Sequence, residues 1–140
     1  MNPRHKGRTQ PCSAHEAGAK LQRAEKFLEA AQLITDEPDP DPDFVSAAAA
    51  LAVLAGISAS DAACCKALGR RSRGDDHHDA EKLLDEITPG GKDGANALRR
   101  LINLKDEAHY GFYNIGAKDL DRAMRQAQKM ISFARDILSR

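Results

Sequence analysis

The amino-acid sequence predicts an all-α protein, an up-and-down bundle of four to five helices. Apolar residues recur at helical spacing in every long segment, and no segment shows the alternation expected of a half-buried strand. The connections between these segments are short, which favours antiparallel neighbours. The chain has 140 residues, a length typical of one domain with a single core. We therefore expect one helical domain over residues 13–140, after a basic, disordered tail over residues 1–12.

Local signals mark the first helix and the linker that follows it. Ser13 and Glu16 match a capping box, in which each side chain binds the backbone N–H of the other residue. An apolar stripe then continues until residues 36–43, where three prolines at alternate positions favour extended structure. The same segment holds five acidic residues, so we expect a solvated linker.

The second helix is predicted over residues 42–68 and should be the central element. Asp41 and Pro42 suit its cap and first turn, and Gly69 suits its end. Residues 44–60 carry no charge, but they fall short of the roughly 20 strongly apolar residues that a membrane span needs. We therefore expect a buried helix and no membrane among the partners of the chain.

Three further helices are expected. A short one lies around residues 80–87, with Asp75 or Asp76 as its cap and the sequence TPGG as its end. A fourth helix runs over about residues 92–110. A fifth runs over about residues 117–138 and carries a continuous apolar stripe.

Composition restricts the possible functions and the compartment. Lys plus Arg and Asp plus Glu both total 21, so any contact with nucleic acid has to come from a local patch. The chain has three cysteines, and Cys64 and Cys65 are helix neighbours that cannot easily bridge each other. Because the N-terminus, which includes Cys12, shows no signal-peptide pattern, we expect a reduced, cytoplasmic chain.

Lys105 and His109 interrupt the apolar face of the fourth helix, one turn apart. Either the helix projects beyond the bundle and both residues lie at its rim, or they form a polar site between helices. In such a site His109 could exchange protons near neutral pH. Asp61 is the lone acid in the apolar run of the second helix. We expect it to pair with Lys105, His109 or a nearby arginine.

The segment RRSRGDDHHDAEK, residues 70–82, mixes basic, acidic and imidazole side chains. Its arginines form a candidate phosphate-binding patch, although a salt-bridged loop before a helix would have the same composition. His77 and Glu81, one turn apart, are a single pair of possible ligands, and we expect no metal and no cofactor. Five residues of this segment are candidate binding residues for phosphate: Arg70, Arg71, Arg73, His77 and His78.

Three pieces of the sequence carry a family resemblance: AGISASDAACCKALGRRSRGDDHHDAEKLL, ALRRLINLKDEAHYG and the final amphipathic helix. Together, over about residues 14–138, they resemble the HEPN superfamily of small bacterial helical-bundle domains. The resemblance implies a bundle of four or five helices that commonly dimerises. Many members are metal-independent ribonucleases of toxin–antitoxin and defence systems, often encoded beside a nucleotidyltransferase-fold partner. Others bind nucleotides or nucleic acid without catalysis.

The nuclease motif of active members is an Arg followed, after four to six residues, by a His. KDEAHYG holds the corresponding place, but no Arg precedes His109 at that spacing, so the motif is incomplete and Lys105 is the nearest cation. His109 and Lys105, already singled out by their place in an apolar face, are the catalytic candidates. Asp61 and Tyr110 are further binding candidates. Arg73 and His78 match the spacing at another place in the chain.

The expected function is binding of RNA or a nucleotide by a dimeric, cytoplasmic bundle. Phosphates would meet the three arginines of residues 70–73, with Lys105 and His109 in a groove between helices. One alternative is an active metal-independent endoribonuclease. Another is an interaction module whose alanine-rich faces assemble with a partner chain.

Overall fold

The computed structural model describes residues 8–73, 77–110 and 116–140, with side chains described for all of these except residues 106–110. The predicted all-α bundle is confirmed, with the addition of one short two-stranded sheet. The elements in chain order are β1 (Thr9–Pro11), α1 (Ala14–Thr35), α2 (Pro42–Leu68), β2 (Arg70–Ser72), α3 (His77–Asp85), α4 (Gly91–Tyr110) and α5 (Ala117–Leu138).

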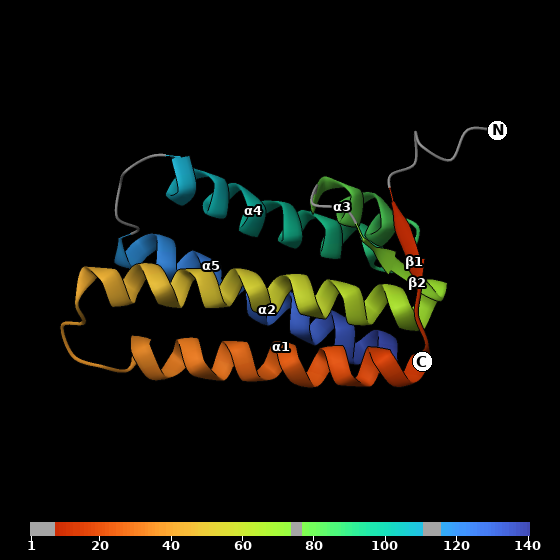
Figure 1. Cartoon of the computed structure of the whole chain (residues 1–140), viewed down its shortest axis with the longest axis horizontal. Helices are drawn as coiled ribbons and strands as arrows, with labels where there is room; N and C mark the ends of the chain where they lie inside the picture. The colour runs from red at the N-terminus through yellow and green to blue at the C-terminus, as the bar shows by residue number, and fades with distance from the viewer. Residues whose placement is uncertain (1–7, 74–76, 111–115) are drawn as a thin grey trace.

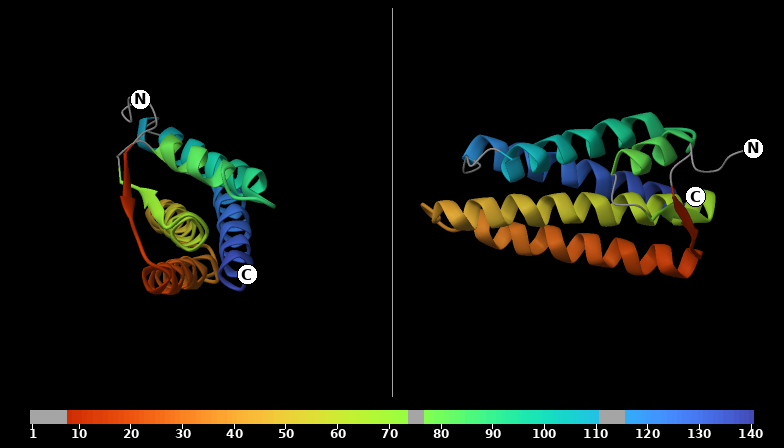
Figure 2. Two further views of the ribbon diagram at one scale, coloured as in Figure 1. Left: turned by 90° about the vertical axis from the view of Figure 1, so that its right-hand side faces the viewer. Right: turned by 45° about the horizontal axis from the view of Figure 1, so that its top comes forward.

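Four long helices run alternately up and down, as Figure 1 shows. Helix α2 lies at the centre, in contact with α1, α4 and α5. The short helix α3 packs against α4 at the end of the bundle that also holds the sheet and the C-terminus (Figure 1). Seen along the helices, α1 and α5 lie against α2, and α3 with α4 covers a further side (Figure 2).

The predicted helix caps are confirmed at three ends. Ser13 Oγ accepts a hydrogen bond from the Glu16 backbone N–H at 3.1 Å, and Glu16 Oε1 accepts one from the Ser13 backbone N–H at 3.3 Å. The Asp41 carboxylate accepts from the Asp43 N–H at 2.7 Å and so begins α2. Gly69 ends α2 with φ of 72°, a left-handed conformation that favours glycine.

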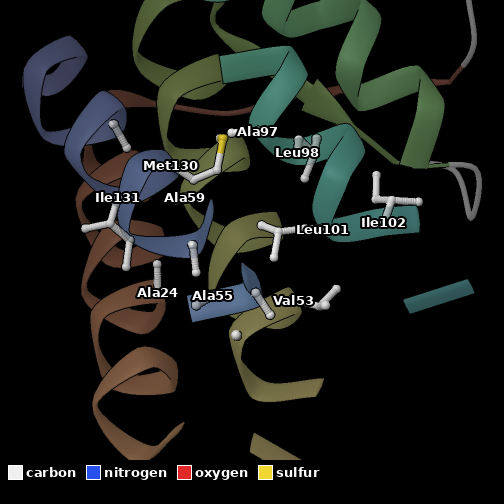
Figure 3. Close-up of a cluster of buried hydrophobic side chains, with 14 of the residues drawn as sticks. Ala24, Val53, Ala55, Ala59, Ala97, Leu98, Leu101, Ile102, Met130 and Ile131 are labelled. Atoms are coloured by element: carbon white, nitrogen blue, oxygen red, sulfur yellow. The ribbon is translucent and has the colours of Figure 1, made fainter. Parts of the chain in front are cut away.

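The core surrounds α2 and is built largely from alanine on α1 and α2 and from larger side chains on α4 and α5 (Figure 3). Gly56 allows the alanine-rich helix α2 to pack closely against α4. A Cβ atom at this position would overlap the Leu101 side chain of α4, and Met130 of α5 packs beside it. Leu101 and Met130 are both completely buried. The glycine thus admits a leucine where a larger residue would hold α4 away from α2.

Among the described helices, α2 is long and apolar enough to cross a membrane by length and composition. Its most apolar window has a mean hydropathy of 1.7, and 72% of that window is buried inside the bundle. Such burial is typical of the core helix of a soluble protein, which is the structure that the sequence predicted for this segment.

Two expectations about the N-terminal segment are wrong. Thr9–Pro11 forms strand β1, which pairs antiparallel with β2, so that Thr9 lies opposite Ser72 and Pro11 opposite Arg70. Residues 9–12 are therefore part of the fold and not of a disordered tail, whereas residues 1–7 lie outside the described part of the chain. Strand β1 is only three residues long, too short to show the alternation that marks a strand in a sequence.

The second correction concerns the cysteines. Cys12 and Cys65 form a disulfide, with Cα atoms 5.2 Å apart, so the expectation of a fully reduced chain is wrong. Cys64 and Cys65 do not bridge each other, as the helix geometry predicted, and Cys64 is a buried free thiol. The partner of Cys65 lies 53 residues away, in the segment interpreted as a tail.

Candidate functional site

A group of charged side chains lies where β2 contacts α2 and α3, and where α3 packs against α4. We call this group the polar corner. Its members come from segments that are distant in the sequence, and the β1–β2 pairing and the packing of α3 on α4 bring them together. The residues of the polar corner are Asp61, Arg70, Arg71, Arg73, His78, Glu81, Glu86 and Arg99.

Asp61 is the acid that α2 contributes to the polar corner. Its Oδ2 lies 3.9 Å from Lys20 Nζ and 4.0 Å from Arg71 Nη1, and its side chain is 15% exposed. Burial raises the pKa of Asp61 to about 6, and the two cations oppose this rise. The prediction that Asp61 needs a cationic partner is confirmed, and Arg71 is the nearby arginine that the sequence offered.

The arginines of β2 are held to different degrees. Arg70 Nη2 donates a hydrogen bond to Glu86 Oε1 at 2.7 Å. Arg71 Nη1 donates to the Ser72 carbonyl oxygen at 3.3 Å, while Arg71 Nε and Ser72 Oγ are buried with no hydrogen-bond partner among the described residues. Arg73, just after the strand, is exposed and forms no ion pair with any described residue. Arg70 is thus hydrogen-bonded to a carboxylate and Arg71 lies within ion-pair distance of one, whereas Arg73 has no such partner among the described residues.

A histidine and an arginine share one buried carboxylate at the start of α3. His78 Nδ1 lies 2.6 Å from Glu81 Oε2, and Arg99 Nη1 lies 3.9 Å from Glu81 Oε1. The Glu81 side chain is 11% exposed, against 54% for His78 and 51% for Arg99. Arg99 Nη2 also donates to Asn96 Oδ1.

Sequence reasoning missed the roles of Glu81 and Arg99. It paired Glu81 with His77, one turn away, whereas the contact in the structure is with His78, three residues before Glu81. The spacing between His78 and Glu81 was a usable local signal, because residues three apart are also neighbours on a helix. Arg99 gave no such signal, since its contact with Glu81 depends on how α4 packs against α3.

Lys105 lies outside the polar corner. It is exposed, as the interpretation of a rim position predicts. Its place in α4 is 14 residues beyond Gly91, or about 21 Å along the helix axis, toward the opposite end of the bundle (Figure 1). The arginines of β2 and Lys105 therefore do not form the single groove that we expected, and Lys105 is not the partner of Asp61.

Other candidates fall partly or wholly outside the described residues. The side chains of His109 and Tyr110 are among those not described, although both residues belong to α4. Asp75 and Asp76, the expected caps of α3, also lie outside the described part of the chain. His77 is the first residue of α3 and is half-buried.

The electrostatic arrangement of the polar corner is layered around Glu81. Glu81 lies beneath the exposed side chains of His78 and Arg99, whereas Asp61 and Arg71 are 15% and 22% exposed and so lie at a similar depth. Glu81 thus lies within ion-pair distance of two groups that face the solvent, the imidazole of His78 and the guanidinium of Arg99. A guanidinium held in this way can bind an anion with little loss of side-chain entropy. A carboxylate on one imidazole nitrogen orients the ring for proton transfer at the other.

The described residues contain no group of three or more side chains that could hold a metal ion. The chain matches no family model, no curated protein and no solved structure. Its function is therefore inferred from its own residues.

Proposed function

We propose that the chain is a HEPN-like bundle that binds phosphate groups of a nucleic acid or nucleotide at the polar corner. The observation that supports this proposal is that the carboxylates of Asp61 and Glu81 lie within 4.0 Å of Arg71, Arg99 and His78, and that Arg99 and His78 face the solvent. Arginine in such a setting can meet a phosphate with paired N–H groups. The dimer, the toxin–antitoxin context and the nucleotidyltransferase-fold partner belong to the same proposal, through the resemblance. The cytoplasmic location is proposed as well, and the Cys12–Cys65 disulfide, a kind of bond that is rare in cytosolic proteins, is the observation against it.

The spread of the cations favours a nucleic acid over a single nucleotide. Arg70 and Arg73 lie on and just after β2, whereas Arg99 lies on α4. Arg73 is exposed and forms no ion pair with any described residue. Cations on separate elements can contact successive phosphates of one strand, which is how most of the affinity for nucleic acid arises.

Binding is tested with a labelled single-stranded RNA whose dissociation constant is measured at several salt concentrations. We expect Arg73→Gln to weaken binding and to reduce the slope of log K against log salt by about 1, because the variant neutralises one phosphate fewer. Arg122→Gln is the matched control, because Arg122 is equally a surface arginine but lies on α5 and pairs with Asp119 at 3.7 Å. An unchanged affinity and slope in Arg73→Gln would contradict the proposal.

The pair of His78 and Glu81 favours a second candidate function, cleavage of RNA without a metal. His78 would accept the proton of a ribose 2′-hydroxyl while that oxygen attacks phosphorus, and Arg73 or Arg99 would stabilise the charge on the phosphorane. The bond from phosphorus to the 5′-oxygen would then break, and the leaving oxygen would take a proton from water, giving a 2′,3′-cyclic phosphate. The 2.6 Å contact between His78 Nδ1 and Glu81 is the specific support for this candidate.

Cleavage is tested by incubating the full chain with labelled RNA in EDTA. If His78 is the base, cleavage persists in the chelator, disappears in His78→Ala and falls by a factor of about 100 in Glu81→Gln. His109→Ala is the informative comparison, because His109 holds the place that the motif histidine has in the family that the sequence resembles. Loss of cleavage in His109→Ala alone would assign the chemistry to the motif position and not to the polar corner.

A pure interaction module is the third candidate, supported by the apolar side chains that α2 exposes. Phe44 is 61% exposed and Leu54 is 45% exposed. A chain that neither binds nor cuts RNA, but forms a stable complex that depends on these two residues, would belong to this class.

A further inference from the structure

A second basic site lies between α4 and α5, apart from the polar corner. A groove of about 560 Å³ separates the polar edges of these two helices. Arg100 of α4 and Arg125 and Lys129 of α5 line it, and all three are exposed. Asp93 is the one acidic residue among the lining side chains. We call this site the α4–α5 groove.

The cations of this groove differ from the other basic residues of α5. Arg122 pairs with Asp119 at 3.7 Å, and Arg135 Nε donates to Glu25 of α1 at 3.2 Å. By contrast, neither Arg125 nor Lys129 forms an ion pair with any described residue, and the same holds for Arg100. Three like charges around one hollow repel each other, and an anion bound among them would remove this repulsion.

An aromatic ring lines the groove beside these cations. Phe133 of α5 is half-buried, and its ring lies against Gly94 of α4. A Cβ atom at Gly94 would come within 3.0 Å of ring atom Cε2, so only a glycine allows the ring to lie so close to the α4 backbone. The groove thus combines an apolar, planar surface with positive charge, which suits a ligand that carries both a ring or sugar and an anionic group.

Gln126 adds an unpaired polar group to the lining. The residue is 8% exposed, and its Oε1 is buried with no hydrogen-bond donor among the described residues. A buried acceptor without a donor is unfavourable, and a turn of the terminal amide can offer it to a ligand. A hydroxyl or N–H group on an organic ligand would donate a hydrogen bond to this acceptor. An inorganic anion offers fewer such donors.

We propose that the α4–α5 groove binds a phosphate monoester of nucleotide size. The phosphate contacts Arg100, Arg125 and Lys129, and the base or sugar lies on Phe133. The volume of about 560 Å³ is in the usual range for small-molecule sites. The groove uses none of the polar-corner residues, so this site and the proposed nucleic-acid site can exist independently.

The test is calorimetric titration of the full chain with AMP. We expect AMP to bind and the double variant Arg125→Gln/Lys129→Gln to weaken its binding at least about tenfold, since each substitution removes a charge-assisted hydrogen bond. The matched control is Arg122→Gln, on the same helix but outside the groove, with an expected change of less than about twofold. Absence of AMP binding at millimolar concentration, or equal affinity in the double variant, overturns the proposal.

Inorganic phosphate, RNA and the variant Phe133→Leu test the separate parts of the proposal. Inorganic phosphate should bind more weakly than AMP, and Phe133→Leu should weaken AMP while leaving inorganic phosphate unchanged. Equal binding of the two ligands would contradict the contact with Phe133. AMP binding that is lost in Arg73→Gln but kept in the double variant would overturn the groove site and assign the ligand to the polar corner. RNA binding that persists in the double variant supports two separate sites.

Discussion

The two halves of α2 are held in place by different kinds of interaction. Residues 44–59 carry no charge and pack through small apolar side chains such as Ala55 and Ala59 (Figure 3). Within this half, Gly56 leaves room for the Leu101 side chain. Residues 60–68 instead contain Asp61, paired with Lys20 and Arg71, and Cys65, bonded to Cys12. The first half depends on many weak contacts that are insensitive to pH and redox state. The second depends on a few specific bonds, each of which responds to a solution condition.

The largest expected effect is that of reducing the disulfide in the second half. Because Cys12 and Cys65 are 53 residues apart, the cross-link should stabilise the fold by about 4 kcal/mol through the loss of unfolded-state entropy. Urea unfolding with and without reducing agent measures this difference. Cys12→Ala/Cys65→Ala should be as unstable as the reduced protein and insensitive to the reductant. Equal stability of oxidised and reduced wild-type protein would contradict the prediction.

Asp61 should make the second half sensitive to pH. Its pKa is raised from 3.8 to about 6 in the folded state, so the folded protein binds a proton more tightly than the unfolded chain. The contribution of Asp61 to the free energy of unfolding should therefore be most favourable below pH 4 and should fall between pH 4 and 6. Above pH 6 it should be lower by roughly 3 kcal/mol. In Asp61→Asn this fall should be absent.

The measurement for Asp61 is the urea midpoint of both proteins at several pH values from 4 to 7. The difference between wild type and Asp61→Asn isolates Asp61 from the other titrating groups. A difference that does not change with pH would mean that Asp61 has the same pKa in the folded and unfolded states.

In the first half, the same substitution at two glycines should give opposite results. Gly56→Ala should cost about 1–3 kcal/mol, because the new methyl group overlaps Leu101. Gly18→Ala in α1 should stabilise by about 0.5–1 kcal/mol, because no atom of the described residues lies within 4 Å of the new Cβ and alanine favours a helix. Thermal unfolding of the two variants measures both values. If both variants were stabilised, α2 and α4 would not be in close contact at this position.

The smallest effect is expected on the exposed side of the first half. Phe44→Ser should change the free energy of unfolding by less than about 0.5 kcal/mol, because Phe44 is 61% exposed. A loss that is larger and that grows with protein concentration would mean that another copy of the chain covers Phe44. Denaturation at two protein concentrations separates these outcomes.

The features of α2 that the sequence predicted are local ones. The cap at Asp41, the end at Gly69 and the burial of the helix follow from residue types and their order, and the structure confirms all three. The need of Asp61 for a cation also followed from its apolar surroundings, and one of the named partners, a nearby arginine, is correct.

The features that the sequence did not predict depend on contacts between distant segments. Strand β1 exists because it meets β2, and the disulfide exists because that pairing brings Cys12 to Cys65. Lys105 shows the same limit. A helical wheel gives the direction of its side chain but not how far along α4 the neighbouring helices extend.

The disulfide also determines how the molecule carries mechanical load. A force that pulls the two termini apart reaches Cys12 and passes through the sulfur atoms directly to Cys65. All of α1 and most of α2 then lie in a closed loop that bears no tension. With the disulfide intact, the unfolded chain should extend by about 180 Å less than the reduced chain, because the 53 peptide units between the cysteines are bypassed.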